Sequence, residues 1–323
     1  PIGVIGSTSA NALAGEADVV LAIGTRLQDF TTGSWTAFSP DAQFVAINAA
    51  RFDAVKHRAC SVVGDALECV GELDEALGDW SLGEGHLAHA KALFAEWDAL
   101  VDAHQAPTNA PVPTYAQIVG AVNRWAGPND TLVTAAGGLP GEVTKGWRVK
   151  SPNTFDCEFG FSCMGYEIAG AWGARIAQAE REPDQDVITF CGDGSYMMLN
   201  SDIYSSVLSR KKLIVMLLDN GGFAVINKLQ NNTGNESFNN LLADCPTVPE
   251  PFAVDFEAHA ASQGAIAETV SNPAELGEAF TRAKASDRTH VILMKVDPYE
   301  GWTTEGHAWW EVGTPHITDS DRV

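Results

Sequence analysis

Two short apolar runs in the middle of the chain alternate with polar turns. Residues 187–191 (VITFC) and 213–218 (LIVMLL) have the length and β-branched content of buried strands. Residues 196–211 between them are typical of a helix, whose buried face would include Met198, Ile203 and Val207. Strand, helix and strand predict a parallel βαβ unit. The carboxyl ends of its two strands meet at one edge of the sheet, where open α/β sheets bind ligands.

The turns that follow these runs carry metal-binding chemistry. The first turn reads Gly-Asp-Gly-Ser at 192–195, and the second reads Asp-Asn-Gly-Gly at 219–222. Mg²⁺ prefers hard oxygen ligands, few of them from protein and the rest from water and phosphate. Asp193 offers a carboxylate, Asn220 a side-chain carbonyl and Gly222 a backbone carbonyl. These three residues are the predicted ligands of a divalent cation.

The first turn is also suited to phosphate. Gly192 and Gly194 let the backbone turn sharply and approach a ligand closely. Ser195 begins a helix, whose first amide groups are free to bind an anion. The chemistry that fits both turns is a divalent cation that holds a diphosphate.

The spacing of the two turns resembles the signature of thiamine-diphosphate enzymes. There a GDG turn is followed, after about the 220 − 193 = 27 residues found here, by an Asn and then by a Gly two residues later. A GDG tripeptide alone is usually an ordinary tight turn, but the flanking strands and helix make the composite pattern specific. The resemblance implies that thiamine diphosphate and Mg²⁺ are the cofactors.

Two further segments are similar to this family. Residues 159–174 resemble the Gly-x-Met-Gly turn and the small-residue helix that precede GDG, and by that resemblance Met164 props the cofactor in its bent, reactive form. Residues 134–139 resemble a loop that contacts the diphosphate through Gly137 and Gly138. Either segment taken alone would indicate only close helix packing through small residues.

The remaining details resemble one branch of the family, the trihydroxycyclohexane-dione hydrolases of inositol catabolism. Asp219 replaces the first Asn of the usual Asn-Asn pair, and residues 158–167 and 307–313 agree with that branch. The resemblance covers essentially the whole chain. It implies a small cyclic dione as substrate and hydrolysis of one of its C–C bonds to give 5-deoxy-glucuronate. Trp309 and Trp310 are predicted to line the substrate pocket, although Trp pairs more often bury area at a subunit contact.

Two other functions stay open. One is carboligation of the acetolactate-synthase or glyoxylate-carboligase type. Asp219 and the pair Trp309 and Trp310 favour the hydrolase over this function. The other is a non-catalytic assembly subunit, which the retention of both metal-ligand positions disfavours. Ser195 and His259 do not indicate an acyl-transfer triad, because no Gly-x-Ser-x-Gly elbow surrounds Ser195.

The pattern as a whole predicts an α/β protein with two doubly wound parallel-sheet domains. Residues 1–101 resemble part of a central domain, residues 102–113 form a Pro-containing linker, and residues 114–323 form the diphosphate- and Mg-binding domain. No GxGxxG motif occurs in the first domain, so FAD is not expected there. Its predicted elements are strands at 2–5, 19–23, 44–47 and 61–63 and helices at 9–16 and 66–77.

Local signals place several helix ends. Thr114 and Gln117 form a capping box for a helix that runs to Trp125, and Asn272 caps a helix with Pro273 in its first position. Residues 86–100 predict a helix whose histidines face solvent, and residues 290–296 predict a last strand.

The amino-acid composition limits the kinds of binding partner and the cellular compartment that we expect. With 20 basic and 42 acidic residues the formal charge is −22, which argues against nucleic acid and anionic membranes as partners. An anionic cofactor must therefore be held by a local metal and by amide groups. The 6 cysteines show no metal-binding spacing, and no signal peptide or membrane-spanning run occurs, so we expect a cytoplasmic protein with reduced thiols.

One part of the family pattern is missing from the sequence. The resemblance implies an N-terminal pyrimidine-binding domain, usually donated by a partner subunit of a homodimer or tetramer, whose glutamate activates the cofactor. That domain is not recognisable in residues 1–323, and the start at Pro1 suggests a fragment or a processed polypeptide. Glu158 and Glu167 flank the propping turn and do not match the activating position. We therefore expect the chain alone to bind the cofactor poorly and to be inactive.

Overall fold

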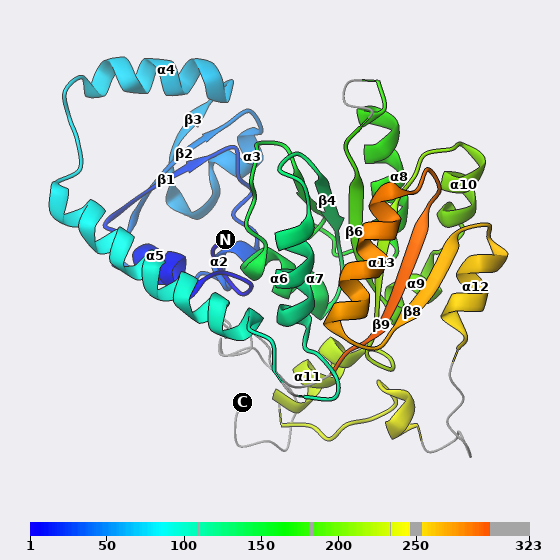
Figure 1. The fold of residues 1–323 in the computed structure, drawn as a ribbon. Coiled ribbons are helices and arrows are strands. Elements are labelled where there is room, and N and C mark those ends of the chain that lie inside the picture. Colours follow the sequence, from blue (N-terminus) through cyan, green and yellow to red (C-terminus); the bar gives the residue numbers. More distant parts are fainter. Residues whose placement is uncertain (109, 181–183, 233, 246–253, 298–323) are drawn as a thin grey trace. The chain divides into compact units, whose positions relative to one another are not determined.

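The computed structural model describes residues 1–108, 110–180, 184–232, 234–245 and 254–297. The chain divides between Leu100 and Val101 into two compact units (Figure 1). Each unit is built on a parallel β-sheet with helical connections. The predicted α/β class with two parallel sheets is thereby confirmed.

The first unit contains a three-stranded parallel sheet in the order β1-β2-β3. Its strands are β1 (Val19–Ile23), β2 (Gln43–Asn48) and β3 (Cys60–Val63). Its helices are α1 (Thr8–Glu16), α2 (Asp29–Thr32), α3 (Arg51–Ala54), the 3-10 turn η1 (Lys56–Arg58), α4 (Ala66–Leu77) and α5 (Glu84–Gln105), the last of which continues into the second unit. Aromatic and small side chains, including Ala22, Ala46 and Phe44, pack on one face of this sheet. The other face leaves Val19, Leu21 and Ile23 exposed at 55%, 45% and 42%.

The predicted strand at residues 2–5 is wrong, because this segment forms a turn. Gly3 has a left-handed backbone with φ 92°, and its N–H donates to Asn11 Oδ1 at 2.8 Å. Asn11 Nδ2 in turn donates to the Gly3 carbonyl at 2.9 Å. A side chain of α1 thus satisfies the backbone groups that a neighbouring strand would otherwise pair.

The second unit contains a six-stranded parallel sheet in the order β5-β4-β6-β7-β9-β8. Its strands are β4 (Thr131–Thr134), β5 (Phe155–Cys157), β6 (Val187–Gly192), β7 (Ile214–Asp219), β8 (Ile266–Val270) and β9 (His290–Lys295). Its helices are α6 (Tyr115–Trp125), α7 (Gly138–Gly146), α8 (Tyr166–Gln178), α9 (Asp193–Met198), α10 (Asp202–Leu208), α11 (Ala224–Asn232), the 3-10 turn η2 (Leu242–Asp244), α12 (Phe256–Ser262) and α13 (Pro273–Ala285).

Helices cover both faces of this sheet, as Figure 1 shows for the layer in front. Alternate strand residues such as Ile188 and Met216 join α6, α7 and α13 in one hydrophobic cluster. Their neighbours, such as Val215 and Leu217, join α8, α10 and α12 in the other cluster. The first five residues of both β6 and β7 are buried, so these strands end at a fixed position on the sheet edge.

The predicted single helix at 196–211 is wrong, because it is broken into α9 and α10. Leu199 is extended, with φ −154°, and lies so close to Gly165 that a Cβ built there would be 2.4 Å from the Leu199 Cβ. Asn200 Nδ2 donates to the Tyr196 carbonyl at 2.9 Å and so satisfies the end of α9. Ile203 is fully buried as predicted, whereas Met198 is 56% exposed.

The predicted helix caps are present. The Thr114 and Gln117 side chains form both hydrogen bonds of the capping box, and Asn272 accepts from two backbone N–H groups at the start of α13. Helix α5 runs through Gln105, beyond the predicted start of the linker, and Gln105 Nε2 donates to the Gly146 carbonyl at 2.8 Å. None of the helices within the described ranges has the length and apolar character needed to cross a membrane.

The structure predicts a pH dependence of stability centred on His290. This side chain at the start of β9 is 3% exposed, and its Nε2 donates to Glu268 Oε1 at 2.8 Å. Burial, aided by Arg282 and Lys212, lowers the pKa of His290 below its ordinary 6.5, while Glu268 opposes the shift. As the pH falls, His290 therefore becomes protonated in the unfolded chain at a higher pH than in the folded chain. The contribution of neutral His290 to the unfolding free energy is complete above pH 6.5 and declines as the pH falls below that value.

Urea unfolding at about pH 8 and about pH 5.5 measures this dependence. His290→Gln should lose less unfolding free energy between the two pH values than the parent chain does. His86→Gln, which changes an exposed histidine of α5, is the matched control and should behave like the parent. An unchanged pH dependence in His290→Gln would contradict the assignment.

Candidate functional site

Three predicted turns lie at the carboxyl edge of the six-stranded sheet, where β4, β6 and β7 are neighbours. The chain enters α7 after β4 and α9 after β6, and it reaches α11 a few residues after β7. Gly192 at the end of β6 is in register with Leu218 of β7. The parallel register therefore brings residues 192–195 and 219–222 to the same height on the sheet.

A hydrogen bond joins two of the predicted metal ligands. The backbone N–H of Asn220 donates to Asp193 Oδ1 at 3.5 Å. The side-chain oxygen of Asn220 accepts from the Gly222 N–H at 3.2 Å. All three predicted ligands thus lie within one connected pair of turns.

The electrostatics of this edge are strongly negative. The Asp193 side chain is buried, and burial together with the nearby Asp219 carboxylate raises the pKa of Asp193 to about 7. Backbone N–H groups of Asn220, Asp193 and Gly194 oppose the shift. A positive charge bound here would relieve the repulsion between the two carboxylates.

The predicted metal ligands do not form a cluster of acidic, His or Cys side chains. Within the described part of the chain, no three or more such side chains are arranged to hold a metal. The predicted set consists instead of one carboxylate, one amide oxygen and one backbone carbonyl, a combination suited to a cation that keeps other oxygen ligands.

The backbone at Gly222 is tightly held. Its φ is 144°, and a Cβ at this position would lie 2.4 Å from the Asn240 carbonyl oxygen. Phe223 N–H donates to that same carbonyl at 2.7 Å, and Leu242 N–H donates to Gly221 at 3.0 Å. The segment 240–242 therefore fixes the turn after β7, and only glycine fits its centre.

Sequence reasoning did not identify Tyr115 as part of the site. This buried tyrosine lies in the first turn of α6, and its hydroxyl accepts a hydrogen bond from Asn220 Nδ2. Burial is the main reason that the pKa of Tyr115 is raised, and the carboxylates of Asp193 and Asp219 add to the shift. The capping box predicted where α6 begins, but no local signal shows what its first turn faces.

Glu167 connects three segments of the predicted cofactor site. Its Oε1 accepts from Ala136 N–H at 3.2 Å, its Oε2 accepts from Gly165 N–H at 2.8 Å, and the Ser195 hydroxyl is a third partner. The side chain is 1% exposed, and burial raises the pKa of Glu167 against the effect of these donors. Its role in the structure is therefore to hold three turns together.

Glu158 organises the loop before the predicted propping residue. Its carboxylate accepts from Phe161 N–H at 2.8 Å and from Cys163 N–H at 2.9 Å. Within this loop Ser162 has a left-handed φ of 52°. These hydrogen bonds hold the pKa of Glu158 below its usual range.

Met164 lies beside the first turn. A Cβ on Gly194 would lie 3.4 Å from Met164 Cε and 2.7 Å from a ring carbon of Phe223. The site therefore has an apolar wall of Met164 and Phe223 against the glycine turn. Phe223 was not predicted, although it directly follows a predicted ligand.

Two of the other predicted cofactor-binding glycines, Gly137 and Gly192, lie next to open space. Gly137 has φ 92° and precedes α7, which begins at Gly138. No atom lies within 4 Å of the Cβ position of Gly137 or Gly192. Both glycines thus leave room for a ligand to approach the backbone. The predicted substrate residues Trp309 and Trp310 lie outside the described residues.

Two family models match segments of the chain. The family described as "Thiamine pyrophosphate enzyme, C-terminal TPP binding domain" matches residues 135–294. The family described as "Thiamine pyrophosphate enzyme, central domain" matches residues 1–73. The first match contains every predicted metal and cofactor residue.

Curated relatives extend the comparison over the full chain. Proteins named 3D-(3,5/4)-trihydroxycyclohexane-1,2-dione hydrolase from Bacillus thuringiensis (strain Al Hakam) and Listeria innocua are each 34% identical to it, over 352 and 345 residues. The matches cover 100% and 99% of this chain but 54% and 53% of the relatives. The protein of that name from Clostridium botulinum (strain Eklund 17B / Type B) is 33% identical, with 100% and 54% covered. The chain thus spans about half the length of these relatives.

The hydrogen bonds of Glu167 predict that Glu167→Gln destabilises the second unit. Glutamine has one side-chain oxygen, so its amide group would face an N–H that Glu167 now satisfies. We expect a loss of about 1–3 kcal/mol in unfolding free energy, measured by urea denaturation. Glu180→Gln, an exposed residue beyond the end of α8, is the control and should stay within about 0.5 kcal/mol of the parent. Equal stability of the two variants would show that Glu167 does not hold the turns.

Proposed function

Because this chain belongs to the thiamine pyrophosphate enzymes, of which it carries the central and C-terminal domains, we propose that it is the cofactor-holding part of a thiamine-diphosphate-dependent hydrolase. Its substrate would be trihydroxycyclohexane-1,2-dione, opened at a C–C bond to 5-deoxy-glucuronate in inositol catabolism. The names of relatives at 34% identity support this substrate.

The observation that carries the proposal is the pair of turns at the ends of β6 and β7. The buried Asp193 carboxylate lies beside the Asp219 carboxylate, so the donors present fit a small divalent cation. Asp193, Asn220 and the Gly222 carbonyl would hold Mg²⁺. Among the described residues the Gly222 carbonyl accepts no hydrogen bond that would compete.

The diphosphate would lie over the glycine turns. Gly137 and Gly192 leave open space above their backbone, and Gly138, Gly194 and Ser195 begin the adjoining helices. Because the chain carries a net charge of −22, general attraction cannot hold an anionic cofactor. The cation and the backbone amides would have to do so.

The chain's own contribution to catalysis is orientation. Bound thiamine diphosphate supplies an electron sink for C–C bond cleavage. Met164 and Phe223 form the apolar wall against which the cofactor would rest. Glu167 and Glu158 fix the backbone on either side of Met164, so the wall keeps its position when the ligand binds.

Activation of the cofactor would come from a separate pyrimidine-binding domain. Glu158 and Glu167 are each engaged with backbone N–H groups, which supports a structural role for both. We propose that the protein works as a homodimer or tetramer in which a neighbouring subunit's pyrimidine-binding domain supplies the activating glutamate. The 6 free cysteines support a reducing, cytoplasmic location.

Asp193→Asn tests the metal site. In calorimetry with Mg²⁺ and thiamine diphosphate, using the chain together with a chain that bears the pyrimidine-binding domain, affinity should fall by roughly 100-fold or more. Changing a residue that only hydrogen-bonds to a metal ligand already lowers metal affinity or activity by about 10–100-fold. Asp184→Asn, which changes an exposed carboxylate before β6, should bind like the parent. Binding that survives in Asp193→Asn would refute the ligand assignment, and absence of binding in the parent complex would favour an assembly subunit.

A substrate panel tests the reaction. The same two-chain complex, assayed with the cyclic dione, pyruvate and glyoxylate, should hydrolyse the dione, while the isolated chain should be inactive with all three. Release of 5-deoxy-glucuronate is the measurement. Carboligation of pyruvate or glyoxylate without dione hydrolysis would favour the acetolactate-synthase or glyoxylate-carboligase reading. Turnover by the isolated chain would contradict the need for a second domain.

A further inference from the structure

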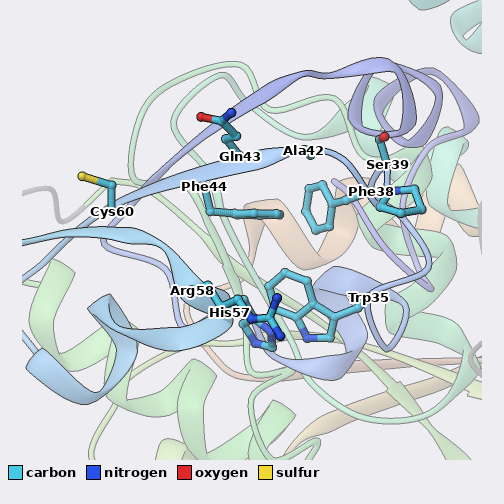
Figure 2. A pocket seen from close by; sticks show the side chains of 10 residues that line it. Trp35, Phe38, Ser39, Ala42, Gln43, Phe44, His57, Arg58 and Cys60 are labelled. Carbon is cyan, nitrogen blue, oxygen red and sulfur yellow. The ribbon is translucent and has the colours of Figure 1, made fainter.

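The first unit contains a pocket that the proposed function does not use. Its volume is about 640 Å³, and it lies at the amino-terminal ends of β2 and β3, where Phe44 and Cys60 contribute to its lining. Figure 2 shows the rings of Phe38 and Phe44 on one side and Trp35, His57 and Arg58 on the other. This volume is within the range of about 300–1,000 Å³ that is typical of small-molecule sites.

The aromatic lining is held by contacts among its own rings. Trp35 and Phe44 have ring centroids 5.2 Å apart in an edge-to-face arrangement, and Phe38 and Phe44 are 5.1 Å apart in the same arrangement. The His57 ring lies against the Trp35 indole with 31° between the planes. Phe38 is 8% exposed, so this wall is anchored in the core of the unit. The pocket is therefore formed before any ligand arrives.

The backbone next to the pocket is strained. His57 and Arg58 are consecutive residues with left-handed φ of 56° and 60°. Asn, Asp and His adopt this conformation more readily than other non-glycine residues, so the backbone strain falls mainly on Arg58. Here it directs both side chains toward the pocket (Figure 2).

Arg58 is the one permanently charged side chain among the pocket-lining residues. Acidic residues outnumber basic ones by 42 to 20, yet within the described residues Arg58 has no carboxylate partner. Its neighbour Lys56 differs, because its Nζ pairs with Asp53 at 2.7 Å and donates to the Arg26 carbonyl at 2.9 Å. The guanidinium of Arg58 is thus available to an anion.

We propose that this pocket binds a small planar anion, a ring that carries one carboxylate or phosphate group. The ring would pack against Trp35 and Phe44, and the anionic group would pair with the Arg58 guanidinium, whose planar fork matches both groups. The pocket lies at the strand ends opposite to the edge where open α/β sheets bind dinucleotides. It therefore requires no glycine-rich turn, and its recognition depends on the ring and on one charge.

Matched pairs of probes test the proposal in the full 323-residue chain. Calorimetry would compare nicotinate with nicotinamide, and phenyl phosphate with phenol, so that the two members of each pair differ mainly in charge. We expect the anion of at least one pair to bind with a dissociation constant of about 1 mM or lower, and its neutral partner to bind at least about 10-fold more weakly. The pair that responds shows whether carboxylate or phosphate is preferred.

Two variants test whether Arg58 supplies the positive charge that binds the anion. Arg58→Asn keeps a residue that tolerates the left-handed backbone and should weaken anion binding by about 10-fold or more. Arg51→Asn changes an exposed arginine of α3 outside the pocket and should leave binding unchanged. The far-UV circular dichroism and melting temperature of both variants should match those of the parent.

Three results would overturn the proposal: equal binding of charged and neutral probes, equal binding by the parent and Arg58→Asn, or no saturable binding of either anion. None of these outcomes bears on the metal site, because the pocket residues all belong to the first unit.

Discussion

Two carboxylates of like charge meet where neighbouring strands β6 and β7 end. Burial and the Asp219 carboxylate raise the pKa of Asp193 to about 7, and backbone N–H groups supply the opposing influence. Burial is the main cause of the raised pKa of Tyr115 in α6, and the same two carboxylates add to it. A bound cation is the simplest way to stabilise such an edge, and the glycine turns beside it leave room for the cation's further oxygen ligands.

The position of this edge depends on how firmly the sheet and the turns are held. Strands β6 and β7 are buried up to their last residue, so the turns begin at defined points. Glu167 then joins three otherwise separate segments, including the residues before α8 and the start of α9. Burying this carboxylate is costly, and its hydrogen bonds offset the cost only while all three segments keep their places. The site is thereby fixed by the protein before a ligand binds.

The parts of the structure that were predictable from sequence are those with local signals. The capping box at Thr114, the cap at Asn272 and the two apolar runs all depend on neighbours within a few residues. What could not be predicted depends on distant contacts. Asn220 meets Tyr115 across 105 positions, and the N–H of Ala136 meets Glu167 across 31. The break after α9 has the same origin, because Leu199 packs against Gly165 instead of continuing the helix.

The strongly acidic composition links the two candidate sites. In a chain with a charge of −22, the mean field repels every anion, so an anionic ligand must be held by charges placed individually. At the ends of β6 and β7, the buried Asp193 and the half-buried Asp219 would attract a metal ion, and the metal would present positive charge to a diphosphate. In the first unit Arg58, which has a left-handed backbone, lines the pocket, so the protein itself supplies the positive charge there. Both sites would place positive charge at one point. At the diphosphate site a bound metal ion would supply that charge, and in the first unit the Arg58 side chain supplies it.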